Sequence, residues 1–266
     1  MKNLICQVAI KGPKIGNLES ASMHSYTQEL FDTCIADCRD YANKINAEYY
    51  LMTEVEYDLD IPKPNLIAPY QRNALWTNPK FAEYDNIVYM DADYAPNMHT
   101  MPNIFEVMGS SDQIFFAVPD NRYDIKTGEE KKTKAKIYKD LGLREDYRYF
   151  NNGFMCMKRQ LIEETKDLID DYMKQSYSYE MYEQDAINRI IHDKYFEYGF
   201  LHKNWNGVFS VDEPNFAIHY AGMAKQKFTT EKHRRLQSRK KLSDKIWYTF
   251  DRRVEKVEAP SLEGFI

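Results

Sequence analysis

Two aspartates, Asp91 and Asp93, stand one residue apart in the segment NIVYMDADYAP, directly after the apolar run 87–90. Carboxylates this close repel each other, and neither is readily desolvated without a compensating positive charge. A divalent cation would supply that charge and could bridge the oxygens of a phosphate. The alternative is a polar strand end that faces water. If repulsion dominates, replacing either aspartate by Asn should slightly raise the stability of the metal-free protein.

A histidine and a lysine follow later in the segment AIHYAGMAK. A lone histidine is more often structural than a ligand, but a neutral His219 imidazole would complete the two carboxylates into a three-ligand metal set. The loop that contains Gly222 ends at Lys225, whose ammonium group can meet a phosphate.

Two further polar clusters could take part in the chemistry. Asn151 and Asn152 precede a glycine in FNNG, where simple turn chemistry is the alternative explanation. Glu183, Gln184 and Asp185 lie at the start of a helical pattern, where acidic residues are also favoured by the helix dipole.

The elements that must position these residues alternate along the chain. Buried strands are expected over 4–10, 48–53, 87–90, 113–119 and 149–158. Helices are expected over 25–47, 71–81, 103–108 and 182–195, and the second of these is expected to be interrupted or to end near Pro79. The polar segment 120–149 is expected to be a loop with short helices. Strands alternating with helices predict an α/β domain with a largely parallel sheet covered on both faces. No repeat is apparent, and no boundary before about Thr229.

Length and composition narrow the class of protein. The 266 residues suit one large domain, and the formal charge of −5 argues against nucleic acid as the main partner. No apolar run approaches the roughly 20 residues needed to span a bilayer, and the first residues resemble a strand rather than a secretory signal. The four cysteines lack zinc-site spacing, which predicts reduced, mostly buried thiols in a cytoplasmic protein.

The order of the motifs carries a resemblance to a known family. YMDAD at 89–93, FNNG at 150–153, EQDAIN at 183–188, NWN at 204–206 and HYAGMAK at 219–225 occur in the order typical of glycosyltransferase family 8. The chain resembles this family, which includes glycogenin and bacterial lipopolysaccharide galactosyltransferases, over residues 4–225.

The resemblance implies a GT-A fold, an α/β architecture with a mostly parallel central sheet flanked by helices. It also implies a retaining transfer of a sugar from a nucleotide-diphosphate donor, usually a UDP-sugar, with Mn2+ or alternatively Mg2+ as the cofactor. Asp91, Asp93 and His219 match the metal set. The other assignments that the resemblance implies are Arg72 at the donor sugar and phosphate, Asn151 at the sugar, Gln184 beside the anomeric carbon with Glu183 and Asp185 flanking it, and Lys225 at the diphosphate. Asn152 and Gly222 are also expected to bind the substrate.

Some positions depart from the family pattern. Glu183 stands where the family has aspartate, and Asn152 stands where it has alanine or serine. These changes affect the expected donor sugar more than the reaction type. Gln184 is a poor nucleophile, whereas Asp185 could act as one if it points inward, so double displacement and same-face attack both stay open.

The segment 229–266 forms a separate unit in the predicted organisation, after a glycosyltransferase domain over 1–228. Lys and Arg dominate 232–253, with aromatic residues near its end. One hypothesis is a basic-aromatic helix that binds an anionic membrane carrying a lipid-linked acceptor. The other is a charged helix packed on the domain. Glycan and protein acceptors are equally consistent with the sequence.

Two other functions share the Asp-x-Asp pattern. A phosphatase of the haloacid dehalogenase type uses the first aspartate as a nucleophile, but it places Thr or Val where this chain has Ala95. A catalytically silent relative that only binds sugar nucleotides would keep the fold without turnover. Loss of the metal set would be typical of such a relative, and here the set is intact.

Overall fold

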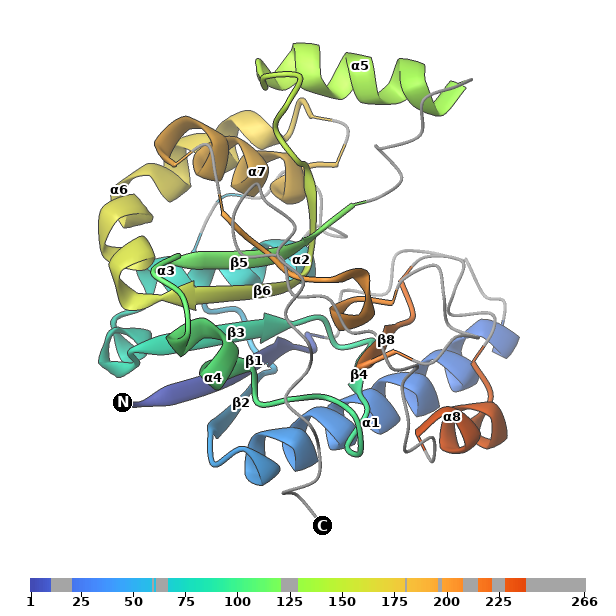
Figure 1. Ribbon diagram of the computed structural model, residues 1–266. Helices are drawn as coiled ribbons and strands as arrows, with labels where there is room; N and C mark the ends of the chain where they lie inside the picture. Colours follow the sequence, from blue (N-terminus) through green and yellow to red (C-terminus); the bar gives the residue numbers. More distant parts are fainter. Residues whose placement is uncertain are drawn as a thin grey trace.

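A computed structural model of the chain describes residues 1–10, 21–58, 60, 67–120, 129–179, 181–195, 198–207, 215–221 and 228–237. Its centre is a six-stranded sheet with the strand order β2-β1-β3-β6-β5-β7, and β4 and β8 form a second, two-stranded sheet beside it (Figure 1). The strands are β1 Asn3–Val8, β2 Glu48–Met52, β3 Asn86–Met90, β4 Tyr94–Pro96, β5 Phe115–Pro119, β6 Phe150–Lys158, β7 Gly199–Phe200 and β8 Ala217–His219.

One strand runs against the others in the large sheet. β1 pairs in parallel with β2 and β3, and β5 pairs in parallel with β7, whereas β6 is antiparallel to both of its neighbours, β3 and β5. The mostly parallel sheet predicted from the sequence is therefore confirmed. The carboxyl ends of β1 and β3 and the amino end of β6 meet at one edge.

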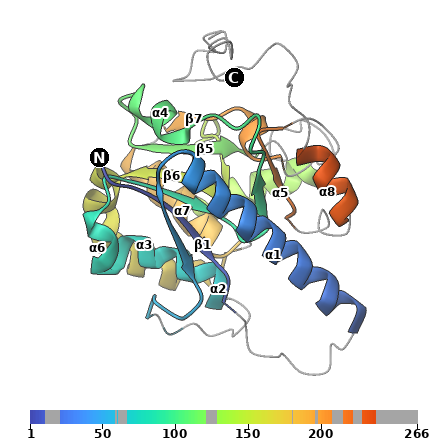
Figure 2. The ribbon, with the colours of Figure 1, turned by 90° about the horizontal axis from the view of Figure 1, so that it is seen from below.

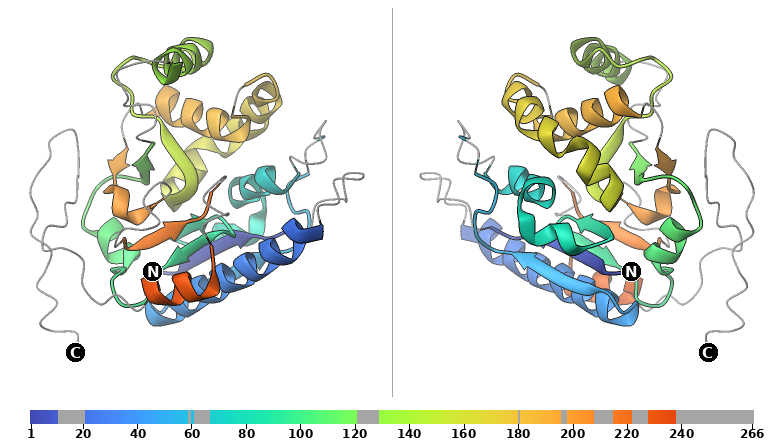
Figure 3. Two further views of the ribbon diagram at one scale, coloured as in Figure 1. Left: turned by 90° about the vertical axis from the view of Figure 1, so that its right-hand side faces the viewer. Right: turned by 90° about the vertical axis from the view of Figure 1, so that its left-hand side faces the viewer.

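Helices cover both faces of the sheet. α1 (Ala21–Lys44) and α4 (Ile104–Gly109) pack on one face, and Figure 2 looks onto the side that α1 crosses. α3 (Ala74–Thr77), α6 (Arg159–Ser176) and α7 (Glu183–Lys194) pack on the other face, so that the sheet lies between two helical layers (Figure 3). The remaining helices are α2 Ile67–Tyr70, α5 Glu129–Leu141, α8 Thr230–Gln237 and the 3-10 turns η2 Gln71–Asn73, η3 Pro79–Glu83 and η5 Lys203–Trp205.

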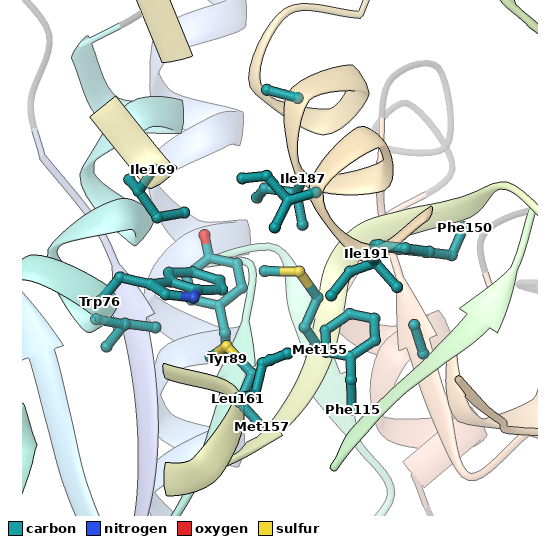
Figure 4. Close-up of a cluster of buried hydrophobic side chains, with 14 of the residues drawn as sticks. Trp76, Tyr89, Phe115, Phe150, Met155, Met157, Leu161, Ile169, Ile187 and Ile191 are labelled. Carbon is teal, nitrogen blue, oxygen red and sulfur yellow. The ribbon is translucent and has the colours of Figure 1, made fainter. Parts of the chain in front are cut away.

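The alternation of side chains along each strand divides the core between these layers. Ile87 and Tyr89 contribute to the cluster under α6 and α7, whereas Val88 and Met90 contribute to the cluster under α1 and α4. Figure 4 shows the first cluster, in which Ile187 and other side chains of α7 meet those of β5 and β6. Because strands covered on both faces are apolar throughout, they read as continuous hydrophobic runs in the sequence.

Several elements differ from the sequence expectations. The helix expected over 71–81, with an interruption near Pro79, is divided further into η2, α3 and η3, and Pro79 begins η3 because it cannot continue α3. Much of the polar segment 120–149 forms α5, a single helix of 13 residues. The strand expected over 4–10 ends at Val8. The helix α6 was not anticipated, although it buries Leu161, Ile169 and other residues along one stripe.

The basic C-terminal segment is described as far as Gln237. Within it, α8 lies against α1, where Nε2 of His233 is 2.8 Å from Oδ2 of Asp37 and Gln237 donates to the same oxygen at 3.1 Å. Most of the segment 232–253 proposed to contact a membrane lies outside the described residues. Among the helices that are described, none is both long and apolar enough to cross a bilayer.

The cysteines have the environment that the sequence predicts. All four are free thiols, and all four are buried. Burial raises the pKa of Cys38 and Cys156 well above the ordinary value for a thiol, which disfavours the nucleophilic thiolate.

Candidate active site

The two aspartates and the distant histidine converge at the sheet edge. Asp91 follows the last residue of β3, and its main-chain N–H donates to the carbonyl of Gly153 at 2.8 Å. The small sheet supplies the third group, because β4 pairs with β8 so that Tyr94 lies opposite His219. As a result, Nε2 of His219 lies 3.1 Å from Oδ1 of Asp93 and 3.4 Å from Oδ2 of Asp91.

The arrangement of these three side chains fits a divalent cation. One ligand atom from each residue lies within 4.8 Å of the others. Nε2 of His219 is buried and makes no well-aligned hydrogen bond to any of the described residues, although it faces two carboxylates. An imidazole nitrogen with two carboxylate oxygens is a donor set typical of Mn2+ or Mg2+ sites that also bind phosphate.

The proton on His219 is placed by a chain of two side-chain amides. The main-chain N–H of Gly153 can only donate, and it donates to Oδ1 of Asn151 at 3.0 Å. Asn206 Nδ2 donates to the same oxygen at 3.1 Å, so Asn206 Oδ1 is the atom that faces Nδ1 of His219, at 2.8 Å. Nδ1 therefore carries a proton, and Nε2 is the nitrogen available to a metal.

Replacing Asn206 by Ala is expected to weaken Mn2+ binding about tenfold, because the ring of His219 loses the acceptor that fixes its tautomer and orientation. Isothermal titration with Mn2+ measures the effect. Asn86→Ala is the matched control, since Asn86 is a buried asparagine at the opposite end of β3. Equal Mn2+ affinities for the two variants would contradict this role of Asn206.

Arg72 supplies the permanent positive charge of the site. It lies in η2, is 5% exposed, and stacks its guanidinium over the ring of Tyr89 at 4.6 Å. Nη1 donates to the carbonyl of Asn152 at 2.8 Å, and Nη2 donates to Oδ1 of Asp91 at 3.1 Å and lies 3.7 Å from Oε1 of Glu183. One buried cation thus joins η2, β3, β6 and the start of α7.

This compensation argues against the expected repulsion between the aspartates. Burial alone would raise the pKa of Asp91, but Arg72 and then His219 outweigh burial and hold that pKa well below its usual range. Burial lowers the pKa of His219, yet the charges of Asp93 and Asp91 raise it to about 9. Removing a carboxylate therefore breaks ion pairs, and the expected gain in stability is not supported.

The acidic start of α7 is buried rather than solvated. Glu183, Gln184 and Asp185 are 8%, 4% and 1% exposed. Burial raises the pKa of Glu183, an effect that Arg72 opposes. Oε1 of Gln184 accepts from Nδ2 of Asn151 and from the main-chain N–H of Asn152, each at 3.3 Å.

The side chain of Asp185 is buried, at 1% exposure. Oδ1 accepts from the hydroxyl of Tyr149 at 2.6 Å, and Oδ2 accepts from the main-chain N–H of Met181 at 2.8 Å. Both oxygens of this carboxylate are therefore engaged within the protein.

The structure thus brings most of the predicted site residues together at one edge of the sheet. Gly222 and Lys225 lie outside the described residues. Sequence reasoning did not assign roles to Asn206, Tyr149 or Gly153. Asn206 and Gly153 belong to the motifs NWN and FNNG, so their places in these motifs could have indicated a role. No motif pointed to Tyr149.

Position 153 requires glycine because the side chains of Asp91 and His219 lie directly beside its Cα atom. A Cβ atom at this position would lie 2.2 Å from Cε1 of His219 and 2.6 Å from Oδ2 of Asp91. No side chain fits there while both ligands keep their places.

Comparisons with known proteins agree with this geometry. The family model described as Glycosyl transferase family 8 matches residues 17–237. Among solved structures, a glycosyltransferase involved in the glycosylation of the major capsid of PBCV-1 has a TM-score of 0.55 at 11% identity, covering 89% of this chain and 99% of that one. The galactosyltransferase LgtC, in complex with donor and acceptor sugar analogs, has a TM-score of 0.50 at 15% identity, covering 88% and 95%. Comparison with curated proteins gives no match.

At these identities the structural likeness establishes the fold. The neighbours are GT-A-type glycosyltransferases, and the fold described above is of that type. The GT-A architecture expected from the motif order is confirmed.

Proposed function

Because the chain belongs to glycosyltransferase family 8, we propose that it transfers a sugar from a UDP-sugar to an acceptor hydroxyl with retention of the anomeric configuration. The observation that carries this proposal is the cluster of Asp91, Asp93 and His219, whose ligand atoms lie within 4.8 Å of one another at the sheet edge. Ligands of open α/β sheets bind at such edges.

The metal set would hold Mn2+, with Mg2+ as the alternative. The ion supplies Lewis-acid stabilisation of the diphosphate leaving group when bound. Arg72 lies beside Asp91 as a fixed positive charge, and the resemblance to the family assigns Lys225, which lies outside the described residues, as a second one. Both cations would favour the charge that accumulates on the departing diphosphate.

The placement of the polar groups at α7 bears on which of the two retaining mechanisms the enzyme would use. A double displacement needs a carboxylate on the far side of the sugar, but both oxygens of Asp185 accept hydrogen bonds and the residue is buried. Gln184 instead offers an amide oxygen, a dipole suited to the oxocarbenium-like half of the transition state. These contacts favour same-face attack assisted by the leaving phosphate.

The acceptor is proposed to be a glycan, a lipid-linked saccharide or a protein. A relative acts in the glycosylation of a capsid, and another is a galactosyltransferase with an acceptor sugar analog bound. We retain the proposed organisation of a transferase domain over 1–228 and a basic C-terminal segment over 229–266.

A donor panel tests the function. UDP-galactose, UDP-glucose, UDP-xylose and their N-acetylated relatives are incubated with the protein with Mn2+ and with EDTA, and UDP release is measured. Metal-dependent hydrolysis of at least one α-linked donor is expected. Proton NMR of the anomeric coupling, read early in the reaction, should give an α product. Binding without turnover would identify a silent relative, and a β product would refute retention.

Replacing Glu183 by Asp is expected to change the preference among donor sugars by about tenfold, with little change in Mn2+ affinity. The shorter aspartate side chain would lose a contact with the sugar, and each well-made polar contact contributes about 1 to 2 kcal/mol. The Mn2+ affinity should change little because residue 183 is not one of the three proposed metal ligands. The ratio of kcat/KM values across the donor panel measures the shift. An unchanged ratio would show that Glu183 serves only to pair with Arg72.

A further inference from the structure

A hydrogen-bond chain connects Gln184 to the interior of the fold. Nε2 of Gln184 donates to the hydroxyl of Tyr149 at 3.0 Å, and that hydroxyl donates to Oδ1 of Asp185 at 2.6 Å. Tyr149 is 2% exposed and lies immediately before β6. The chain therefore leaves the site and ends on a buried carboxylate of the same helix.

The polarity of this chain follows from its two ends. An ionised carboxylate only accepts, so Tyr149 must donate to Asp185 and can receive only a donor from Gln184. At the other end, the main-chain N–H of Asn152 only donates, so the atom of Gln184 beside it must be the amide oxygen. Both constraints give the same orientation of the Gln184 amide.

The backbone around this chain is held in place independently of it. Asn188, one turn after Gln184, accepts from the N–H of Phe150 at 2.9 Å and donates to its carbonyl at 3.0 Å, as a neighbouring strand would. α7 is thereby docked on the first residue of β6. The Gln184 side chain can rotate about its terminal amide without any movement of the helix.

We infer that Tyr149 and Asp185 are positioning residues that hold the amide oxygen of Gln184 toward the donor sugar. The inference rests on the proposed function, since Gln184 matters for turnover only if a sugar is transferred. The oxygen then faces the carbon that becomes positive, and the N–H2 group, which would be repulsive there, faces Tyr149.

The simpler explanation is that Asp185 only caps α7 and Tyr149 only fills the core. Asp185→Asn separates the two explanations. Met181 N–H captures the amide oxygen of the new asparagine, so the cap is kept while its N–H2 group turns to Tyr149. The tyrosine hydroxyl then donates to Gln184, which favours the inverted Gln184 amide in opposition to the N–H of Asn152.

The experiment compares Tyr149→Phe, Asp185→Asn and the double variant, using hydrolysis of whichever UDP-sugar the parent turns over with Mn2+. Tyr198→Phe is the matched control, because Tyr198 is a buried tyrosine of the same core whose hydroxyl donates to a main-chain carbonyl at 2.7 Å. Thermal melting confirms that each variant is folded.

We expect kcat to fall about tenfold in Tyr149→Phe, where only Asn151 and Asn152 still orient the Gln184 amide, and about a hundredfold in Asp185→Asn, where Tyr149 favours the inverted amide against them. The KM for the donor should stay within about twofold. The double variant should resemble Tyr149→Phe, because phenylalanine cannot pass the effect of Asp185→Asn on to Gln184. Adding Tyr149→Phe to Asp185→Asn should therefore restore part of the lost kcat.

Three results would overturn the inference. Tyr149→Phe could match Tyr198→Phe in kcat, the double variant could be slower than Asp185→Asn, or the losses could appear in KM alone. Each would show a purely structural role in an enzyme that is otherwise active. A parent that hydrolyses no donor would instead refute the proposed function, and the positioning role would fall with it.

Discussion

Asp93→Asn is expected to lower Mn2+-dependent donor hydrolysis and transfer about 1000-fold, equivalent to about 4 kcal/mol of transition-state stabilisation. The change removes a charged ligand and leaves the shape of the side chain intact. Steady-state rates at saturating donor over a range of Mn2+ concentrations measure the loss. Asp37→Asn is the control, because Asp37 also lies beside a histidine, His233 at 2.8 Å, but between α1 and α8.

Activity of Asp93→Asn equal to that of Asp37→Asn would refute the metal assignment. Stability in EDTA gives a second check. The raised pKa of His219 means that its pairing with the carboxylates stabilises the fold fully below the unfolded value of about 6.5 and is lost as the pH rises through about 9. In EDTA, the Tm of Asp93→Asn should therefore lie well below that of the parent at pH 6 and close to it at pH 9.5.

Gly153→Ala is expected to abolish Mn2+ binding although no ligand is removed. The new methyl group would overlap Cε1 of His219, at 2.2 Å, and Oδ2 of Asp91, at 2.6 Å, so at least one ligand must leave the metal set. Overpacking of this kind costs roughly 1 to 3 kcal/mol of stability. Titration calorimetry with Mn2+ and thermal melting give the two effects separately.

The matched control for this prediction is Gly109→Ala. A Cβ atom on Gly109, the last residue of α4, meets no atom of the described residues within 4 Å. This variant should keep the Mn2+ affinity and the donor hydrolysis of the parent. Normal Mn2+ binding by Gly153→Ala would mean that the His219 ring can move aside without a loss of Mn2+ affinity. It would contradict the fixed positions proposed for the three metal ligands.

The sequence predicted the sheet well because its strands are buried on both faces. The segments around Ile5, Val88 and Cys156 are continuous apolar runs. A strand buried on both faces has such a run whether it is parallel or antiparallel to its neighbours. For the same reason, no residue pattern indicated that β6 is antiparallel. The interruption of the helix at 71–81 was anticipated at Pro79, where a missing N–H imposes it.

The metal set was predicted from motif order, but its supporting contacts were not. Carboxylates after a strand and a histidine in a second motif can be identified as residue types, whereas Asn206 and Tyr149 act through pairings across 13 and 35 residues. Such contacts depend on the register between β6, α7 and β8. The direction of Asp185 was likewise open until the N–H of Met181 was placed beside it.

The reversed direction of β6 also indicates where the chain can be extended for practical use. β6 begins at the active-site edge and ends at Lys158 on the opposite edge, whose side chain and N–H donate to the carbonyls of Ser111 and Ile114. Ser110 and Asp112, in the short connection between α4 and β5, are exposed there. A fluorescent label or an affinity tag inserted in this connection would be separated from the metal set by the full length of β3 and β6.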